Sequence, residues 1–417
     1  MAIWHVSGGN RLEGKMPVQG SKNAALPILA ASLLAPAQTE LLNVPELSDV
    51  NATMSIIRAL GGKAERDGGN VYIDSRHLTG CTIERGMMRS MRSSVLFMGA
   101  LIARFGEVRL SYPGGCRIGE RPIDMHLAAM RSLGCTIAED GEDIVCRADR
   151  LRGAHIRLKY PSVGATENAM IAACGADGET VIDNAAREPE ITDLQEFLRR
   201  AGAYISGAGS ERIVISGFEP ERRAGYRVMP DRVAAATYIC AAAAAGGDIE
   251  LLCVYPEHFS SLLHFLKRSG CDIISGQNSV RIRSSGKLKA AGSVVTAPYP
   301  GFATDMQPLL AAAMLKAEGV TEICEEVFSS RFEYASELNK LGADISVSGR
   351  KAMITGVKSL HGAKMRSCDL RGGAAMITAA LAAEGESTIS DAGHILRGYE
   401  YFDSRLRSIG ADVSLEL

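Results

Sequence analysis

The chain contains 417 residues, of which 46% are hydrophobic and 23% charged, and its 46 lysines and arginines nearly balance its 48 aspartates and glutamates. This length exceeds what one hydrophobic core usually supports, so we expect two domains of ordinary globular composition. The formal net charge of −2 argues against a general nucleic-acid or membrane-surface binder, although it leaves room for a local basic pocket.

The first residues and the cysteines both predict a cytoplasmic protein. The N-terminus has no basic region followed by an apolar core, and the early apolar run at 24–35 is too short to span a bilayer. The ten cysteines do not form a metal-ligand pattern, because no two lie within four positions of each other. Several of them, such as Cys174 and Cys240, lie in apolar runs, where a reduced thiol behaves as a small hydrophobic side chain.

Six alanine-rich segments recur along the chain. Each is apolar on nearly all sides, and they lie at residues 23–35, 93–105, 166–176, 233–245, 306–318 and 372–384. A helix that is apolar all round is buried, so we predict six core helices. A short β-branched run follows each helix, at residues 39–44, 107–111, 180–183, 248–252, 320–323 and 387–390.

A second series of helices ends at regularly spaced glycines. Endings such as Ile-Arg-Ala-Leu-Gly have basic or polar residues in the last turn, and their glycines are Gly61, Gly134, Gly202, Gly270, Gly342 and Gly410. Glycine readily adopts the left-handed conformation that follows a helix. Six copies at intervals of about 70 residues indicate an internal repeat.

Each repeat is predicted to contain an alanine-rich helix, a strand, a second helix and further strands. We predict three repeats in each of two domains, one at residues 22–229 and one at residues 230–417, completed by residues 1–21. The last repeat has a single strand after its second helix, and residues 3–8 can supply the strand that it lacks. The expected fold class is therefore α/β with buried helices.

The stretch from Pro113 to His126 differs from the matching parts of the other repeats. It places Cys116 among three glycines and two arginines, Arg117 and Arg121, a composition that favours a loop. Neighbouring guanidiniums favour the thiolate by lowering a free-thiol pKa of about 8.5. A small residue in a turn is the alternative, but this repeat also has extra glycine-rich residues, which are typical of a functional loop or lid.

Basic residues begin three of the alanine-rich helices, namely Lys22, Arg92 and Arg371. A helix start stabilises anions, so an anionic ligand explains a cation there better than a structural cap does. The other helix starts have polar residues that, taken singly, are interpreted as ordinary caps. These are Ser162, Thr166, Thr304 and Asp305.

Three further arginines, Arg121, Arg331 and Arg397, occupy related places in their repeats. Arginines grouped with a lysine suggest binding of phosphate or carboxylate groups, although a surface ion pair is the commoner role of any single arginine. The sequence has neither a phosphate-binding loop ending in Lys-Ser or Lys-Thr nor a strand-linked Gly-x-Gly-x-x-Gly. A bound nucleotide would therefore be held in another kind of site.

Many of these stretches together match one known family. They are residues 19–24, 91–93, 113–124, 162–166, 184–191, 230–232, 304–307, 331, 369–371 and 397–400. In these stretches, taken in order, the chain resembles the UDP-N-acetylglucosamine 1-carboxyvinyltransferases, the enolpyruvyl transferases that open bacterial peptidoglycan synthesis. The likeness extends from near residue 1 to near residue 417.

The resemblance implies an inside-out α/β fold of two domains, each with three βαβαββ units, that close over a cleft when the sugar nucleotide binds. It implies transfer of the enolpyruvyl group of phosphoenolpyruvate to the 3′-hydroxyl of UDP-N-acetylglucosamine, with release of phosphate and without metal or cofactor. Such an enzyme acts in the cytoplasm on two small molecules, with no nucleic acid, membrane or obligate protein partner. Through the cell wall it contributes to cell shape and division.

The resemblance also implies roles for particular residues. Cys116 would deliver a proton to the methylene carbon and is the residue that fosfomycin alkylates, while Asp305 would take the proton of the 3′-hydroxyl and, with Asn23, contact the sugar. The residues expected at phosphoenolpyruvate are Lys22, Arg92, Arg121 and Arg397. The uridine-diphosphate part would be lined by Arg121, Pro122, Ile123, Asp124, Met125, Ser162, Val163, Gly164 and Val327, and Arg331 and Arg371 are further expected substrate contacts.

Two positions depart from the family pattern, and two other functions remain as alternatives. Ala234 replaces a common glutamate and Val95 replaces an occasional tryptophan, which leaves the packing of the cleft open. The sibling enzyme that uses shikimate 3-phosphate shares the fold, but the cysteine loop and residues 162–164 match the sugar-nucleotide enzyme. A non-catalytic sensor or nucleic-acid-processing protein is the other alternative, and the charge balance argues against the latter.

Overall fold

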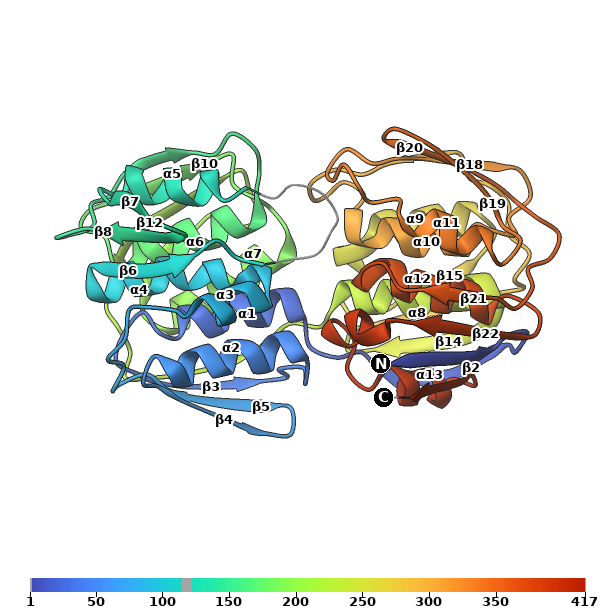
Figure 1. The fold of residues 1–417 in the computed structure, drawn as a ribbon, viewed down its shortest axis with the longest axis horizontal. Coiled ribbons are helices and arrows are strands. Elements are labelled where there is room, and N and C mark those ends of the chain that lie inside the picture. The colour runs from blue at the N-terminus through green and yellow to red at the C-terminus, as the bar shows by residue number, and fades with distance from the viewer. Residues whose placement is uncertain (1, 115–121, 417) are drawn as a thin grey trace. The chain divides into compact units, whose positions relative to one another are not determined.

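The computed structural model describes residues 2–114 and 122–416, which form two compact units (Figure 1). The first unit contains the described residues between 20 and 229, and the second unit contains residues 2–19 together with 230–416. In the described part of the chain, no helix is both long and apolar enough to cross a membrane.

The first unit contains three small sheets, each associated with a pair of helices. The strand orders are β13-β3-β5-β4, β6-β8-β7 and β11-β12-β10-β9. The strands are β3 (Gln38–Leu42), β4 (Lys63–Asp67), β5 (Asn70–Asp74), β6 (Glu107–Ser111), β7 (Thr136–Asp140), β8 (Asp143–Arg147), β9 (His155–Arg157), β10 (Thr180–Asp183), β11 (Ala203–Ser206), β12 (Arg212–Phe218) and β13 (Arg223–Arg227). The helices are α1 (Lys22–Ala31), α2 (Ser48–Ala59), α3 (Arg85–Ser90), η1 (Arg92–Leu96), α4 (Phe97–Phe105), α5 (Asp124–Ser132), α6 (Val163–Cys174) and α7 (Pro189–Arg200).

The second unit has the same plan, with strand orders β15-β16-β14-β2, β17-β18-β20-β19 and β21-β22-β1-β23. The strands are β1 (Ile3–Ser7), β2 (Leu12–Pro17), β14 (Gly247–Leu252), β15 (Asp272–Ser275), β16 (Ser279–Ser284), β17 (Ser293–Val295), β18 (Val320–Cys324), β19 (Asp344–Ser348), β20 (Lys351–Thr355), β21 (Lys364–Arg366), β22 (Glu386–Ser390) and β23 (Asp412–Glu416). The helices are α8 (Arg232–Ala245), η2 (Pro256–Phe259), α9 (Ser260–Arg268), η3 (Thr304–Met306), α10 (Gln307–Ala313), α11 (Tyr334–Asn339), α12 (Leu370–Leu381), η4 (Ala392–Arg397) and α13 (Phe402–Ser408).

Each repeat pairs one parallel strand with a set of antiparallel strands. The parallel pairs are β13 with β3, β9 with β10, β2 with β14, β17 with β18, and β21 with β22. In the remaining repeat the parallel partner is a single bridge, Thr82 to Arg109. The predicted βαβαββ repeats are thus confirmed, with an alanine-rich helix following each parallel partner.

Three strands come from parts of the sequence far from the rest of their repeats. Strand β1 pairs antiparallel with β22 and β23, β2 pairs parallel with β14, and β13 pairs parallel with β3. Within residues 2–114 and 122–416, the chain therefore passes from one unit to the other between residues 19 and 20 and between residues 229 and 230. The two crossing segments are joined by hydrogen bonds from Ser21 N to Met229 O at 2.7 Å and from Asp231 N to Gln19 O at 2.9 Å.

The alanine-rich helices are buried, as their sequences predict. In α8, thirteen residues from Arg232 to Ala244 are buried, and in α12 every residue is buried. Close packing also explains Gly99, because an added Cβ would lie 2.5 Å from Asn168 Oδ1. The predicted C-terminal ends are confirmed for α4 at Phe105 and α8 at Ala245, but the other alanine-rich helices end earlier than predicted. After α1, Leu33 and Leu34 donate to carbonyls three residues earlier, so the last part of the predicted helix is a tight turn.

All six glycines that end the second helices have a positive φ, as predicted. The values are 92° at Gly61, 96° at Gly134, 109° at Gly202, 103° at Gly270, 85° at Gly342 and 88° at Gly410. At such angles a Cβ is disfavoured, so a side chain would strain the turn from helix to strand. The repeat seen in the sequence is therefore a repeated helix ending.

Candidate active site

Lys22 lies at the start of α1 beside an acidic partner. Ser21 caps the helix, its Oγ accepting the N–H of Ala24 at 3.3 Å. The Lys22 ammonium lies 3.2 Å from Asp49 Oδ2, and only 12% and 8% of the two side chains are exposed. A lysine at a helix start opposes the local partial positive charge, and Asp49 compensates for it. The pair fixes a cation in a nearly dry position.

Arg92 begins η1 and contacts the segment that enters α5. Its Nη2 donates to Pro122 O at 3.2 Å. Asp124 is the first residue of α5, where its charge complements the helix start. One residue expected to bind phosphoenolpyruvate thus lies next to residues expected to line the nucleotide.

The start of α6 has an ordinary cap. Ser162 Oγ accepts from Ala165 N at 3.4 Å, and Thr166 Oγ1 donates to Ser162 O at 2.8 Å. Thr166 Oγ1 also accepts from Ala186 N at 3.0 Å, which ties this helix to the segment before α7. The cap interpretation is therefore confirmed for Ser162, but it is wrong for Thr166, which lies inside α6 and donates to the carbonyl one turn earlier.

His126 joins the α5 and α6 starts in a way that the sequence did not predict. Asn168 Oδ1 accepts from Gly99 N at 2.7 Å, and its Nδ2 donates to Val95 O at 2.9 Å and contacts His126 Nδ1 at 3.0 Å. Because the backbone groups fix the amide orientation, His126 Nδ1 is the acceptor and the ring proton is on Nε2. The ring lies against Gly164, where an added Cβ would be 3.2 Å from Cε1.

Asp305, in the second unit, is held by two arginines. Arg331 Nη2 donates to Asp305 Oδ1 at 2.8 Å, and Arg371 Nε donates to Asp305 Oδ2 at 3.2 Å. The two guanidinium side chains are 2% and 3% exposed, whereas the aspartate is 30% exposed. The two buried arginines therefore hold the carboxylate on its inner side, and its outer side is accessible to solvent.

Arg371 is itself fixed from two sides. Asp369 caps α12, its Oδ1 accepting from Arg371 N at 2.8 Å, and Arg371 Nη1 donates to the Tyr399 hydroxyl at 3.2 Å. That hydroxyl lies 2.9 Å from Thr237 Oγ1, and burial raises the pKa of Tyr399. The network holds the guanidinium by its backbone and its side chain, which keeps Asp305 in a defined position.

Arg397 ends the short helix η4, and Val327 lies in the loop after β18. Arg397 is the last residue of η4, and the buried Gln19 holds the residues that follow by donating to Gly398 O at 3.1 Å and accepting from Glu400 N at 2.8 Å. Val327 N donates to Glu325 Oε1 at 2.8 Å in the loop after β18. A remote glutamine thus holds the backbone that follows Arg397, whereas Val327 is held by a buried carboxylate of its own loop.

Comparison with known proteins identifies the family. The model of "EPSP synthase (3-phosphoshikimate 1-carboxyvinyltransferase)" matches residues 6–406. A UDP-N-acetylglucosamine 1-carboxyvinyltransferase 2 of Caldanaerobacter subterraneus is 45% identical over 99% of each chain. A UDP-N-acetylglucosamine 1-carboxyvinyltransferase 1 of Symbiobacterium thermophilum is 46% identical over 98% of this chain and 94% of its own. The chain belongs to the UDP-N-acetylglucosamine 1-carboxyvinyltransferase family.

Solved structures of enolpyruvyl transferases have the same fold. The enolpyruvyl transferase NikO from Streptomyces tendae superposes with a TM-score of 0.90 at 27% identity, covering 99% of this chain and 98% of its own. An EPSP synthase from Acinetobacter baumannii superposes with a TM-score of 0.79 at 22% identity over the full length of both chains. The predicted two-domain inside-out α/β fold class is confirmed.

The described site residues of this carboxyvinyltransferase divide between the two units. Lys22, Asn23, Arg92, residues 122–125 and residues 162–164 belong to the first unit, and Asp305, Val327, Arg331, Arg371 and Arg397 belong to the second. Cys116 and Arg121 lie outside the described residues. Helix starts position most of the described residues, while Val327, Arg331 and Arg397 lie in or beside loops, and the substrate contacts of all of them stay predictions.

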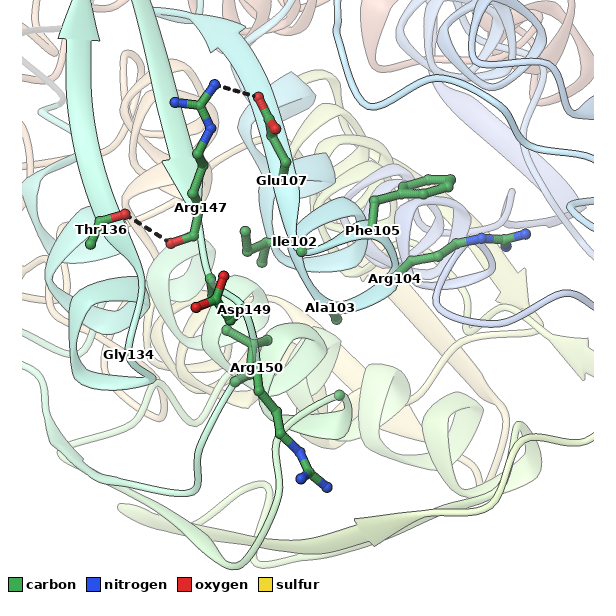
Figure 2. A pocket seen from close by; sticks show the side chains of 14 residues that line it. Ile102, Ala103, Arg104, Phe105, Glu107, Gly134, Thr136, Arg147, Asp149 and Arg150 are labelled. Atoms are coloured by element: carbon green, nitrogen blue, oxygen red, sulfur yellow. Dashed lines mark hydrogen bonds and ion pairs between the residues drawn. The ribbon is translucent and has the colours of Figure 1, made fainter.

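One cavity lies away from these helix starts in the carboxyvinyltransferase. It has a volume of about 790 Å³ and is lined by residues at the C-terminal ends of α4 and α6, including Phe105, Gly106 and Gly175 (Figure 2). Arg147 and Glu107 form an ion pair at its wall, at 2.9 Å. The residues predicted to contact substrate lie at the opposite ends of these helices, so this cavity does not coincide with the predicted site.

The supporting residues Asp49, Asn168 and Glu325 were missed by sequence reasoning. Each acts through long-range contacts, such as Asn168 with Gly99, that no local motif encodes. The signal that was available was polarity within an apolar pattern, since Asn168 lies inside an alanine-rich helix. A buried polar residue needs partners, and here the partners are site elements.

Among the described residues no group of three or more His, Cys, Asp or Glu side chains could hold a metal ion.

Proposed function

We propose that this chain transfers the enolpyruvyl group of phosphoenolpyruvate to the 3′-hydroxyl of UDP-N-acetylglucosamine and releases phosphate, the first committed step of peptidoglycan synthesis. The main support is the identity of 42% to 46%, over at least 98% of the chain, to relatives named UDP-N-acetylglucosamine 1-carboxyvinyltransferase. The chain is therefore a transferase of enolpyruvyl groups.

The reaction is an addition followed by an elimination. In the addition, the 3′-oxygen bonds to C2 of phosphoenolpyruvate, a proton reaches C3, and the 3′-hydroxyl loses its proton. In the elimination, the bond from C2 to the phosphate oxygen breaks and C3 loses a proton, which restores the double bond. Positive charge develops at C2 in both steps, so the reaction needs an acid, a base and a cationic clamp on the phosphate and carboxylate.

Asp305 is the proposed base for the 3′-hydroxyl. Its position, held by Arg331 and Arg371 yet 30% exposed, suits a group that must accept a proton from an entering ligand. Each carboxylate oxygen has a second lone pair, so the arginine contacts do not exhaust its capacity to accept. Arg331 Nε is buried and has no hydrogen-bond partner among the described residues, which supports the proposed contact of Arg331 with substrate.

The proposed cationic clamp on phosphoenolpyruvate consists of Lys22, Arg92, Arg121 and Arg397. The dry ion pair of Lys22 with Asp49 supports this role, because a cation fixed before the reaction needs little rearrangement when charge develops. Cys116 is the proposed acid and the residue alkylated by fosfomycin.

The proposed sugar-nucleotide contacts come from several helix starts and from the loop after β18. Asn23 contacts the sugar, and residues 122–125, residues 162–164 and Val327 line the uridine diphosphate, with Arg371 as a further substrate contact. The start of α6 supports this, because helix N-termini stabilise phosphate.

The product of the reaction provides the test. The protein is incubated with phosphoenolpyruvate and UDP-N-acetylglucosamine, and the nucleotide is analysed by mass spectrometry and carbon NMR. We expect one enolpyruvyl group attached at the 3′-oxygen. Recovery of unmodified nucleotide under conditions where a known family member converts it would refute the proposal.

Shikimate 3-phosphate is the acceptor in the second candidate function. The description of the matching family model favours it, because that description names 3-phosphoshikimate. The similarity to the EPSP synthase from Acinetobacter baumannii, however, is only 22% identity, far below the identity to the sugar-nucleotide enzymes. The same incubation with shikimate 3-phosphate is therefore expected to yield no product.

We also propose the domain division and the cellular setting that the sequence predicted. The domains are residues 22–229 and residues 230–417, the latter completed by residues 1–21, and β1 and β2 support this completion. The protein would act in the cytoplasm on its two substrates without an obligate protein partner, and through the cell wall it would serve cell shape and division.

A further inference from the structure

The carboxylate of Glu325 is buried directly after β18. The residue is 0% exposed, and its backbone is held by Arg350, whose carbonyl accepts from Glu325 N at 2.8 Å. Burying a carboxylate is unfavourable unless hydrogen bonds replace its lost water. Glu325 accepts four such bonds, and their donors lie in three segments of the second unit.

One oxygen of Glu325 holds the residue that precedes Asp305. Oε2 accepts from Thr304 Oγ1 at 2.9 Å, and Thr304 is the first residue of η3. No side chain caps η3, and this bond fixes the hydroxyl of its first residue instead. The backbone that presents Asp305 is therefore anchored at Thr304.

The other oxygen organises the loop after β18. Oε1 accepts from Val327 N at 2.8 Å, from Phe328 N at 3.0 Å and from Thr296 Oγ1 at 2.8 Å. The Phe328 ring lies 5.7 Å from the guanidinium of Arg331. This side of the carboxylate thus shapes the segment that leads to Arg331 and that contains Val327, a proposed nucleotide contact.

We infer that Glu325 is a positioning residue for enolpyruvyl transfer, which holds the base Asp305 through Thr304 and the nucleotide loop through Val327 and Phe328. The inference rests on the proposed function of the site. The two oxygens divide the effect: the Thr304 contact sets the rate of the chemical step, and the Val327 contact sets affinity for UDP-N-acetylglucosamine. Displacements of about 1 Å at a reacting group lower rates by about a hundredfold.

The test uses the full-length protein and separates the two contacts. Thr304→Val removes the hydroxyl at nearly constant volume, and Thr304→Ser keeps it. We expect Thr304→Val to lower kcat by about ten- to a hundredfold, with the KM for UDP-N-acetylglucosamine unchanged within about twofold, and Thr304→Ser to retain most of the activity. Glu325→Gln, whose amide N–H group cannot accept from both sets of donors, should lower kcat and also raise that KM.

Glu326→Gln is the matched control, because Glu326 is the exposed neighbour, with 54% of its side chain accessible. It should leave both constants unchanged. A Thr304→Val variant that lowers the melting temperature but keeps the wild-type kcat would overturn the inference, as would equal losses in the valine and serine variants. If Glu325→Gln does not fold, the comparison of Thr304→Val with Thr304→Ser still tests the inference. Wild-type protein that is inactive with both acceptors would instead refute the proposed function.

Discussion

Tyr226 donates its hydroxyl hydrogen to Asp193 Oδ1 at 2.6 Å, next to the point where the chain leaves the first unit. Asp193 Oδ2 accepts from Met229 N at 3.3 Å, and Met229 O accepts from Ser21 N, the cap of α1. A carboxyl group on α7 is thus linked, through one backbone residue, to the helix start that bears Lys22. Its protonation state matters for the stability of this region.

Burial raises the pKa of Asp193 from 3.8 to about 7, against the lowering effect of its hydrogen bonds from Tyr226 and Met229. The nearby Glu190 and Glu196 add to the rise. Because the folded chain binds this proton more tightly than the unfolded chain, the free energy of unfolding falls as pH rises from about 4 to about 7. This loss amounts to about 1.4 kcal/mol for each unit of pKa difference.

Asp193→Asn should flatten that part of the stability profile. The amide can accept from Met229 N and donate to Tyr226 Oη, so the variant keeps the contacts without the titration. Urea unfolding at several pH values measures the effect. Burial also raises the pKa of Glu167. The free energy of unfolding should therefore still fall with rising pH in both proteins, but less steeply in the variant. Identical slopes in variant and wild type would contradict the role of Asp193.

Gly202 and Gly270 provide a matched test of the helix endings. Both have positive φ, at 109° and 103°, but an added Cβ would lie 1.9 Å from Glu219 O at Gly202 and would meet nothing within 4 Å at Gly270. Gly270→Ala should cost about 1 kcal/mol through backbone strain alone. Gly202→Ala should cost a further 1–3 kcal/mol or so because of the clash. Thermal unfolding compares the two variants. Equal losses of stability would argue against the close contact of Gly202 with Glu219 O.

Hydrogen exchange tests the proposed completion of the second domain by the N-terminal segment. Strand β1 lies between β22 and β23, and Trp4 is 0% exposed. Amides in β1 should therefore exchange as slowly as those in β22, because opening either strand breaks the same sheet. Fast exchange across residues 3–7 in the intact protein would refute this assignment.

Replacement of Cys116 tests the proposed acid. Cys116→Ser should lower turnover by about 10²- to 10⁴-fold, the usual contribution of a positioned proton donor, while calorimetry still detects UDP-N-acetylglucosamine binding. Fosfomycin should label wild-type protein once and the variant not at all. Cys253→Ser is the control, since Cys253 is an exposed cysteine in the described part of the chain. Normal turnover in Cys116→Ser would remove this residue from the mechanism.

The sequence predicted the features that local composition determines. Glycines that must have a positive φ, such as Gly61, and helices that are apolar on all sides, such as α8, leave a signal within a few residues. The end of α10 was not predicted. Its alanine-rich pattern continues to residue 318, but the helix ends at Ala313, and after a turn Glu318 N donates to Leu288 O instead of to the helix.

The sequence pattern also did not predict which distant segments pair, either in the sheets or in the site. Strand β2 has no clean alternation and ends at Pro17, yet it pairs with residues 247–252. In the same way, Glu325 and Asp49 look like ordinary acidic residues until their partners are known. Their roles depend on which segments meet, and only the folded chain determines that.

The central claim is that this chain uses UDP-N-acetylglucosamine as the acceptor of the enolpyruvyl group. Phosphate release from phosphoenolpyruvate, measured with either UDP-N-acetylglucosamine or shikimate 3-phosphate, tests it most directly. We expect phosphate release that depends on UDP-N-acetylglucosamine and is nearly abolished in Cys116→Ser. Release with shikimate 3-phosphate alone, or with neither acceptor, would contradict it.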